Sequence, residues 1–309
     1  MTTTDTPQTL NEQFGLRGRV HFEPGEGGLT RAVLASGRAT AVVYLHGAHV
    51  AQYAPANERG VLFMSGQSRF EAGEPIRGGV PICFPWFGPH SSDAAAPSHG
   101  LARLKAWEVA GAGDVAGAGD VAGRAGQGVR LELTTRIEPF AVRYTVELDE
   151  ALTMRLEVRN VGAAEASFEA ALHTYLAISD IREVEIRGLE GIEYLDKTQG
   201  AARRRQPNEP LRFSGETDRV YLETQATCTL HDPGWRRTIV VAKEGSPNTV
   251  VWNPWEGKAS RLPDFGDAEW PGMVCIETAN VGTGAGAVTL GPGQEQGMTA
   301  RVAVAGHAG

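Results

Sequence analysis

Hydrophobic and polar residues alternate with a period of two in many short segments from Val20 onward, which is the pattern of half-buried β-strands. The best example is a predicted hairpin, in which the alternating segments 142–148 and 152–158 flank a turn at Asp149 and Glu150. Turn-forming residues separate the predicted strands at short intervals. Because no stretch combines a sustained helical period with capping residues, the pattern predicts an antiparallel all-β sandwich or barrel.

We expect residues 1–309 to form one large β-sandwich domain, because sandwiches often exceed the usual domain length. Three segments depart from the strand pattern. Residues 1–8 are typical of a disordered tail, and residues 10–16 have room for one or two helical turns. Residues 110–128 are rich in glycine and alanine and contain the hexad AGAGDV twice. Since a stacked solenoid needs at least three repeats, two copies favour a flexible hairpin insertion.

Composition narrows the class of partner. With 41% hydrophobic and 21% charged residues the chain is an ordinary globular protein, and its net charge of −8 argues against nucleic-acid binding, which needs a basic face. Cys83, Cys228 and Cys275 are widely spaced in apolar runs, as expected of reduced thiols in the cytoplasm. The sequence has no secretion signal and no membrane-spanning apolar run. We therefore expect a cytoplasmic monomer that binds a small molecule, and neither nucleic acid nor a membrane.

One non-repetitive stretch, residues 69–103, places charged residues between glycines and prolines. Prolines recur in it every four to six residues, which excludes a regular helix and a central strand. Arg69, Arg77 and Arg103 are candidates for binding a small anion, because guanidinium groups bind phosphate and carboxylate bidentately. The alternative, in which these arginines only pair with carboxylates of the same chain, stays open from the sequence of the loop.

His173 and Glu277 each stand among apolar residues of a predicted strand, in ALHTYLAI and MVCIETANV. Such a histidine either makes a structural hydrogen bond or acts as a general acid or base, since it titrates near neutral pH. A glutamate there either pairs with an arginine or does acid–base work with a raised pKa, because burying an unpaired carboxylate is costly. Trp252 belongs to a set of tryptophans suited either to stacking on a sugar ring or to ordinary packing.

Several well-known functional motifs are missing from the sequence. It contains no nucleophile elbow, no Walker phosphate loop and no dinucleotide fingerprint. His46 and His49 lie three residues apart, but no acidic or cysteine ligands accompany them. We therefore expect no zinc site and no other metal.

Seven segments in series resemble one family: IRGGVPICFPWFGPH, SHGLAR, ALHTYLAISDI, LDKT, TDRVY, VVWNPW and MVCIETANV. In this order they are similar to the hexose-6-phosphate mutarotases, or glucose-6-phosphate 1-epimerases, of the aldose 1-epimerase (galactose-mutarotase-like) superfamily. The resemblance runs from about Leu10 to Val304 and leaves out only the two ends of the chain and the AGAGDV insertion. It implies a large antiparallel β-supersandwich, in agreement with the strand pattern.

The resemblance also implies roles for individual residues. His173 matches the catalytic histidine of the family, and Glu277 matches its catalytic glutamate. The implied substrate-binding residues are Arg77 and Arg103 for phosphate, with Arg69 as a further candidate, and His99 and Asp218 for sugar hydroxyls.

Anomerisation of an aldose needs a base at the C1 hydroxyl and an acid at the ring oxygen, and it needs no cofactor. The resemblance therefore predicts that Glu277 is the base and His173 the acid in the interconversion of the α and β anomers of a hexose 6-phosphate. Glucose 6-phosphate is the expected substrate. Two alternatives stay open: an epimerase of free glucose or galactose, and a non-catalytic sugar-phosphate-binding protein.

Overall fold

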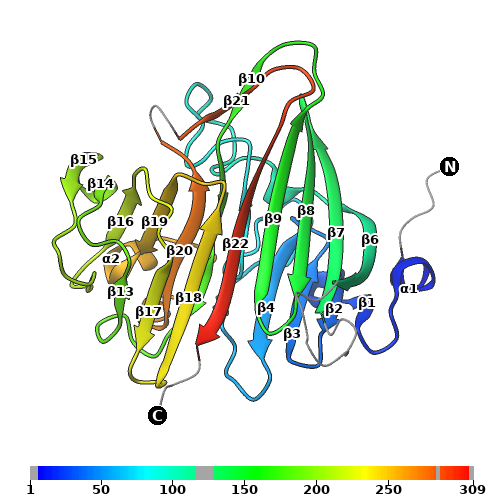
Figure 1. The fold of residues 1–309 in the computed structure, drawn as a ribbon, viewed down its shortest axis with the longest axis horizontal. Coiled ribbons are helices and arrows are strands. Elements are labelled where there is room, and N and C mark those ends of the chain that lie inside the picture. The colour runs from blue at the N-terminus through cyan, green and yellow to red at the C-terminus, as the bar shows by residue number, and fades with distance from the viewer. Residues whose placement is uncertain (1–5, 116–127, 283–285, 306–309) are drawn as a thin grey trace, which may run out of the picture.

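The computed structural model describes residues 6–115, 128–282 and 286–305. Its strands form two layers of antiparallel sheet (Figure 1). One wide sheet lies in front; a second large sheet and a four-stranded sheet lie behind its two halves. Within the described ranges only two α-helices occur, and both are short. The antiparallel all-β architecture expected from the alternation is thus confirmed.

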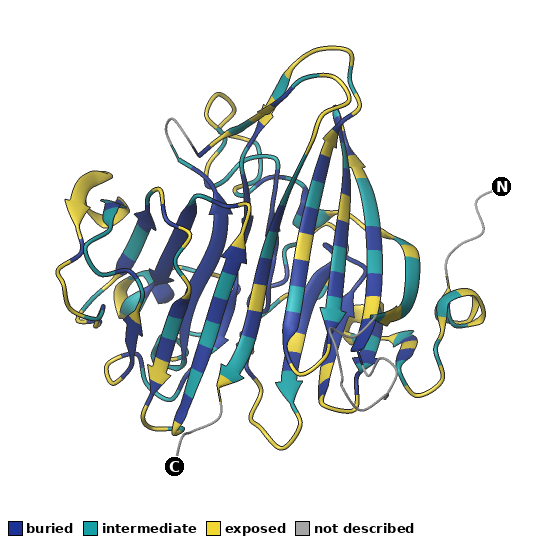
Figure 2. Cartoon of the chain, viewed as in Figure 1, coloured by how far each residue is buried: buried dark blue, intermediate teal, exposed yellow. Residues whose placement is uncertain are grey.

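The front sheet has eight strands and contains the predicted hairpin. In spatial order they are β13 (Glu185–Arg187), β17 (Cys228–Asp232), β18 (Arg237–Glu244), β22 (Glu295–Ala305), β9 (Leu152–Asn160), β8 (Phe140–Leu148), β7 (Gly128–Ile137) and β6 (Glu108–Val115). Buried and more exposed residues alternate along β8 and β9 (Figure 2), and Leu148 pairs with Leu152 across the turn. The hairpin predicted from the alternation is confirmed.

The second large sheet carries the candidate site, and we call it the rear sheet. Its order is β15 (Ala202–Arg205), β14 (Glu193–Asp196), β16 (Thr217–Tyr221), β19 (Asn248–Asn253), β20 (Met273–Asn280), β11 (Ala170–Leu172) and β5 (Ile82–Cys83), with β12 (Tyr175–Ala177) also paired to β20.

Shorter elements complete the fold. The four-stranded sheet is β1 (Val20–Pro24), β2 (Thr30–Ala35), β3 (Ala39–Tyr44) and β4 (His49–Pro55), and β10 (Ala166–Phe168) pairs with β21 (Val288–Leu290). The helical elements are α1 (Pro7–Phe14), η1 (Glu26–Gly28), η2 (Ala102–Leu104), η3 (Lys197–Gln199), α2 (Trp255–Ala259) and η4 (Trp270–Gly272).

Strand β20 has two different faces, because successive side chains of a strand point to opposite sides of the sheet. Val274 and Ile276 join the large core between the sheets. Cys275 and Glu277 point to the outer face of the rear sheet, where Cys275 packs in a separate apolar cluster. Loops cover this outer face, so every residue of β20 is buried. The carboxylate that looked isolated in an apolar run therefore lies on a covered outer face.

Two predicted segments have different boundaries in the structure. Helix α1 begins at Pro7, inside the predicted tail, because the Thr6 side chain caps it by accepting from the backbone N–H of Thr9. Residues 1–5 lie outside the described residues. Strand β6 continues through Val115 and pairs with β7, so residues 110–115 of the predicted insertion are part of a strand. The rest of that insertion, residues 116–127, also lies outside the described residues.

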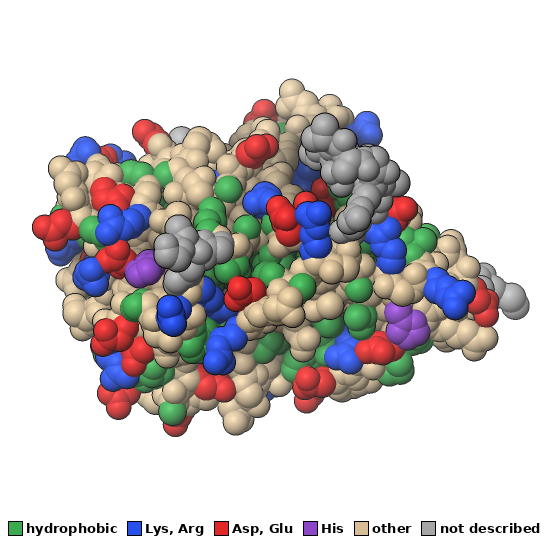
Figure 3. All heavy atoms as spheres, turned by 60° about the horizontal axis from the view of Figure 1, so that its bottom comes forward, with side chains coloured by type: hydrophobic (Ala, Val, Ile, Leu, Met, Phe, Trp, Pro, Cys, Tyr) green, Lys and Arg blue, Asp and Glu red, His purple; other side chains and the backbone are tan. Residues whose placement is uncertain are grey.

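Three features of the structure bear on the expectations drawn from composition. Cys83, Cys228 and Cys275 are buried and form no disulfide, as expected of reduced thiols. No helix within the described ranges is long and apolar enough to cross a membrane. On the face shown in Figure 3, the side chains of Lys and Arg are interspersed with those of Asp and Glu. The expectation that the protein does not bind nucleic acid stays a prediction.

Candidate active site

A pocket of about 420 Å³ lies on the outer face of the rear sheet. Strands β16, β19 and β20 contribute side chains to it, as do the junction between β11 and β12 and several loops. Seven of the eight residues singled out from the sequence line this pocket: Arg77, His99, Arg103, His173, Asp218, Trp252 and Glu277.

His173 and Glu277 meet because β20 pairs with both β11 and β12. The last residue of β11 pairs with Thr278, and the first residue of β12 pairs with Cys275. Two residues intervene on each side, so His173 lies opposite Glu277. Nε2 of His173 is 3.4 Å from Oε1 of Glu277, and the two side chains are only 9% and 1% exposed. The pair is therefore in contact and almost removed from bulk water.

Burial controls where the protons of this pair reside. It raises the pKa of Glu277 well above its ordinary value, and the charge of Asp218 adds to the rise. It lowers the pKa of His173 well below its ordinary value, helped by His99 and Arg77. Because desolvation disfavours both charged forms, the pair favours a protonated Glu277 beside a neutral His173.

The same two residues have unused hydrogen-bonding capacity. Both carboxyl oxygens of Glu277 and Nδ1 of His173 are buried and have no hydrogen-bond partner among the described residues. Nearly all buried polar atoms in proteins have such a partner, and exceptions are frequent at catalytic sites. Because both residues line the pocket, these atoms are candidates for hydrogen bonds to a bound ligand.

Aromatic rings hold the imidazole of His173 in place. It stacks on the ring of Tyr175, with centroids 4.7 Å apart and an interplanar angle of 12°. The ring of Trp252 meets it edge to face at 5.9 Å, and that of His99 at 5.7 Å. Trp252, for which the sequence allowed either packing or a place in a sugar site, thus packs on His173 and also lines the pocket.

His99 is presented by a tight turn. Its own φ is +63°, and that of Gly100 is +76°, where a Cβ would lie 2.1 Å from the carbonyl oxygen of Phe84. The backbone N–H of Gly88 donates to Nδ1 of His99. Burial, followed by the charge of Arg103, lowers the pKa of His99 well below its ordinary value. The neutral ring therefore carries its proton on Nε2, where it can donate to a ligand.

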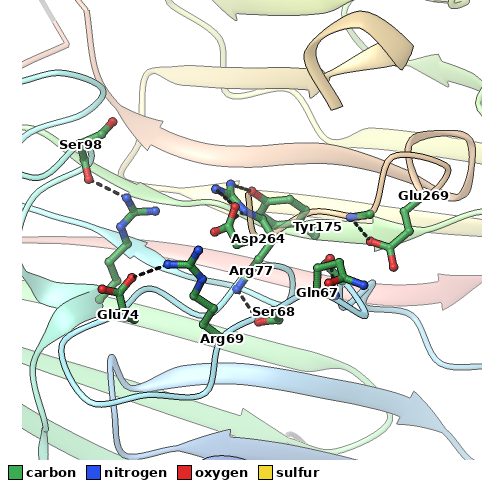
Figure 4. A network of polar contacts seen from close by, with 12 residues as sticks. Gln67, Ser68, Arg69, Glu74, Arg77, Ser98, Tyr175, Asp264 and Glu269 are labelled. Carbon is green, nitrogen blue, oxygen red and sulfur yellow. Dashed lines mark hydrogen bonds and ion pairs between the residues drawn. The ribbon is translucent and has the colours of Figure 1, made fainter. Parts of the chain in front are cut away.

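Arg77 is fixed by two partners (Figure 4). Its Nε and Nη2 donate to the carboxylate of Asp264 at 3.1 and 3.0 Å, and its Nη1 donates to the hydroxyl of Tyr175 at 2.9 Å. Burial alone would lower the pKa of Arg77, but the interactions with Tyr175 and Asp264 outweigh it and raise the pKa. Arg77 thus combines the two alternatives left open by the sequence, since it pairs with a carboxylate and also lines the pocket.

The other two arginines of the loop differ from each other. Nη2 of Arg103 donates to the carbonyl oxygen of Ser98 at 2.6 Å, and its buried Nε has no hydrogen-bond partner among the described residues. Arg103 lines the pocket and retains N–H groups for a ligand. Arg69 does not line the pocket; its side chain is 45% exposed and lies 3.6 Å from Glu74 (Figure 4).

Two lysines that we did not single out from the sequence complete the pocket. Nζ of Lys197 lies over the ring of Phe87, 5.0 Å from its centroid. Nζ of Lys258 lies 3.1 Å from Glu216 and 3.8 Å from Asp218. Lys197 stands in LDKT, one of the segments of the family resemblance, and this was its only signal in the sequence. Lys258 lies just after VVWNPW, another of these segments, and no feature of the sequence marked it as a pocket residue.

The pocket is positively charged, although the chain carries a net charge of −8. Its cationic lining residues are Arg77, Arg103, Lys197 and Lys258. The opposing carboxylates are Asp218 in the lining, Asp264 behind Arg77 and Glu216 beside Lys258, while burial raises the pKa of Glu277 and so disfavours its charged form. Four cations against three carboxylates leave a formal excess of one positive charge. This excess suits an anionic ligand such as a phosphate monoester.

The arrangement is suited to proton transfer. A carboxyl group and an imidazole in contact, with a cationic rim, can exchange protons with the hydroxyl and ether oxygens of an anionic ligand. Within the described ranges, no group of three or more His, Cys, Asp or Glu side chains is placed to hold a metal ion. The expectation of a reaction without metal or cofactor stays a prediction.

Relatives with known sequences share most of the chain. Residues 31–302 match the aldose 1-epimerase family. A protein of Cenchrus ciliaris named "Putative glucose-6-phosphate 1-epimerase" is 36% identical over 278 residues, which cover 87% of this chain and 82% of that protein. A protein of Escherichia coli K12 with the same name is 32% identical over 235 residues, which cover 76% of this chain and 78% of that protein.

Solved structures have the same architecture. The crystal structure of a Salmonella typhimurium protein, described as a "putative mutarotase", has a TM-score of 0.83 at 27% identity and covers 95% of this chain and 96% of its own. A galactose mutarotase-like protein from Clostridium acetobutylicum shares the fold with a TM-score of 0.67 at 13% identity, over 93% of this chain and 98% of its own. Because the family match spans most of the sequence, the chain belongs to the aldose 1-epimerase family.

Proposed function

We propose that this protein interconverts the α and β anomers of a hexose 6-phosphate, with glucose 6-phosphate as the first substrate to test. The observation that carries the proposal is the buried contact of His173 with Glu277 inside a pocket that has an excess of positive charge. Membership of the aldose 1-epimerase family supports the anomer chemistry. The names of the relatives from Cenchrus ciliaris and Escherichia coli support a phosphorylated substrate.

The proposed reaction consists of two proton transfers in each direction. In ring opening, Glu277 takes the proton of the C1 hydroxyl and His173 gives a proton to the ring oxygen, so the C1–O5 bond breaks and an aldehyde forms. Rotation about the C1–C2 bond turns the other face of the aldehyde toward O5. In closure His173 takes back a proton from O5 and Glu277 returns one to the carbonyl oxygen. Each positioned group contributes roughly 10²–10⁴-fold to the rate.

Burial of the pair favours the opening step. The reaction starts from an ionised Glu277 and a protonated His173, and after opening Glu277 is protonated and His173 is neutral. Desolvation raises the pKa of Glu277 and lowers that of His173, so it favours the second arrangement. The C1 hydroxyl that donates to Glu277 stabilises the carboxylate in the first arrangement. The two arrangements are therefore brought closer in free energy when the sugar is bound.

The remaining lining residues would hold the substrate. Arg103, Arg77 and Lys197, which line the pocket, would bind the phosphate, and because this group does not react its binding energy can orient the sugar. The Nε2–H of His99 would donate to a sugar hydroxyl, and the carboxylate of Asp218 would accept from one.

A direct test follows freshly generated α-glucose 6-phosphate to anomeric equilibrium by polarimetry, with and without the protein. Free glucose and free galactose are measured in parallel, and the Glu277→Gln variant, purified identically, is the control for contaminating activity. We expect the protein to accelerate equilibration of the phosphate ester more than that of either free sugar, and the variant to lose this effect.

The other outcomes would decide against the proposal. Acceleration confined to free sugars would make the protein an epimerase of unphosphorylated aldoses. Saturable binding of glucose 6-phosphate without any acceleration would make it a sugar-phosphate-binding protein, and the roles given to His173 and Glu277 would be wrong.

A further inference from the structure

A series of contacts joins the cationic residue Arg77 to the pair formed by His173 and Glu277, and Figure 4 shows its first part, from Asp264 through Arg77 to Tyr175. Asp264 binds Nε and Nη2 of Arg77, Nη1 of Arg77 binds the hydroxyl of Tyr175, and the ring of Tyr175 stacks on His173. His173 in turn contacts Glu277. The side chain of Arg77 is 18% exposed and that of Asp264 is 9% exposed, so water competes little for these contacts.

The contacts of Arg77 leave part of its guanidinium available to a ligand. Asp264 and Tyr175 take three of its five N–H groups, through Nε, Nη2 and Nη1. One N–H of Nη1 and one N–H of Nη2 remain, and these can donate charge-assisted hydrogen bonds to the oxygens of a phosphate.

The backbone ties the same elements together. The N–H of Tyr175 donates to the carbonyl oxygen of Gly79 at 2.9 Å, and the N–H of His173 donates to that of Pro81 at 3.1 Å. Gly79 has φ +57°, and a Cβ there would lie 2.3 Å from the carbonyl oxygen of Val50. The loop that follows Arg77 is thus packed tightly and paired with the segment that bears His173. The segment that follows Arg77 is therefore joined to the segment that bears His173 by side-chain and by backbone contacts.

We propose that Tyr175 and Asp264 are positioning residues that couple occupation of Arg77 by the substrate phosphate to the orientation of the His173 imidazole. This inference rests on the proposed function. Asp264 holds the guanidinium, whose remaining N–H groups can donate to the ligand, and Tyr175 joins that guanidinium to the ring of His173. Phosphate bound at Arg77 then steadies the acid as well as the sugar, so the phosphate raises the rate of the chemical step and not only the affinity.

The test divides the substrate into two pieces. D-xylose is glucose without carbon 6, and phosphite is a small dianion that can occupy the phosphate position. Equilibration of xylose anomers is measured with and without phosphite for the wild-type protein, for Tyr175→Phe and for Tyr53→Phe. Tyr53 is the matched control, because it is a buried tyrosine whose hydroxyl also donates a hydrogen bond, to the carbonyl oxygen of Glu150.

Phosphite should accelerate the wild-type protein and Tyr53→Phe equally. Tyr175→Phe keeps an aromatic ring against His173 but removes the acceptor for Arg77, so its activation by phosphite should fall about tenfold, as expected for the loss of a hydrogen bond to a charged group. The activation is a ratio of two rates on one sample, so a smaller folded fraction does not change it. Equal activation of all three proteins would overturn the inference.

The variant Asp264→Asn distinguishes an effect of the negative charge of Asp264 from its role in positioning the guanidinium of Arg77. If Asp264 acted only through its charge, its removal would strengthen phosphite binding, because a negative group beside the anion would be gone. If it positions the guanidinium, the variant should bind phosphite more weakly and lose the activation. Tighter binding with full activation would remove Asp264 from the proposal.

Failure of this inference is distinguishable from failure of the proposed function. A wild-type protein that equilibrates glucose 6-phosphate but is not activated by phosphite would retain the function and refute the coupling. A wild-type protein without activity on glucose 6-phosphate would refute both.

Discussion

The imidazole of His173 and the carboxyl group of Glu277 lie 3.4 Å apart across the junction of β20 with β11 and β12, and both are buried. Glu277 hydrogen-bonds through neither oxygen to any described residue. A charged pair at this position would contribute little to the stability of the fold, because desolvation disfavours the charged form of each partner. The contact between His173 and Glu277 is suited to transferring protons to and from a bound ligand, and several measurements can test this role.

Replacing Glu277 with glutamine should abolish the base while keeping the shape of the side chain. We expect the rate of anomer exchange on glucose 6-phosphate to fall by at least about 100-fold, the lower end of the usual contribution of a general base. Exchange measured by NMR at equilibrium, with circular dichroism to verify folding, checks this. Retention of even a tenth of the wild-type rate in a folded variant would exclude Glu277 as the base.

The same variant should gain stability, and the gain should depend on pH. Burial raises the pKa of Glu277 in the folded protein well above its ordinary 4.5, so folding takes up a proton at pH values between the unfolded-state and folded-state pKa. The stability that this group contributes is present below about 4.5 and is lost as pH rises through the folded-state pKa. Because glutamine does not titrate, the Tm of Glu277→Gln should exceed that of the wild type at pH 8, and the difference should shrink toward pH 4.5. A difference that is constant with pH would show that the carboxyl group is not desolvated.

Arg103 and Lys197 should matter for the phosphate and not for the sugar. Removing either side chain with alanine should raise KM for glucose 6-phosphate about tenfold, the usual worth of one charge-assisted hydrogen bond, and should change the kinetics with free glucose little. Arg69→Ala is the matched control, since Arg69 is half exposed, pairs with Glu74 and lies outside the pocket lining. A KM effect of Arg69→Ala as large as that of Arg103→Ala would restore Arg69 to the phosphate site.

Asp218 should act on the sugar itself. Its carboxylate lines the pocket, and burial raises its pKa while Lys197 and Lys258 oppose the rise. Asp218→Asn removes a strong acceptor for hydroxyl groups, so kcat/KM should fall about tenfold for glucose 6-phosphate and for free glucose alike. Parallel kinetics on the two sugars check this. An effect confined to the phosphate ester would mean that Asp218 works by steering the neighbouring lysines instead.

Position 100, in the turn that presents His99, should not tolerate a side chain larger than that of glycine. Gly100→Ala adds a methyl group 2.1 Å from the carbonyl oxygen of Phe84 at φ +76°, so we expect a loss of at least about 2 kcal/mol in the free energy of unfolding. Gly73→Ala is the comparison, because Gly73 has φ +87° and open space around it, and it should lose only about 1 kcal/mol. Denaturant unfolding measures both. Equal losses would mean that the packing against Phe84 relaxes freely.

The local alternation of hydrophobic and polar residues was enough to predict the antiparallel all-β architecture. The alternation that predicted the hairpin of β8 and β9 is a property of successive residues, because neighbouring side chains of a strand point to opposite faces whatever the rest of the chain does. The same local view marked His173 and Glu277 as unusual, since titratable groups seldom stand in apolar runs. It failed at helix α1, where the cap at Thr6 extends the ordered chain into a segment whose polar composition resembled a tail.

The assembly of the site was decided by the tertiary structure. The register of β20 against β11 and β12 places His173 opposite Glu277, and no property of either segment alone fixes that register. The path of the loop places Arg77 and Arg103 in the pocket and leaves Arg69 outside it, whereas the composition of the loop did not distinguish the three and the family resemblance gave Arg69 only as a further candidate. Nothing in the sequence marked Asp264 as the partner of Arg77, because the two residues are 187 positions apart along the chain. Contacts of this kind depend on how distant segments pack, whereas the burial pattern of a strand follows from the sequence of that strand alone.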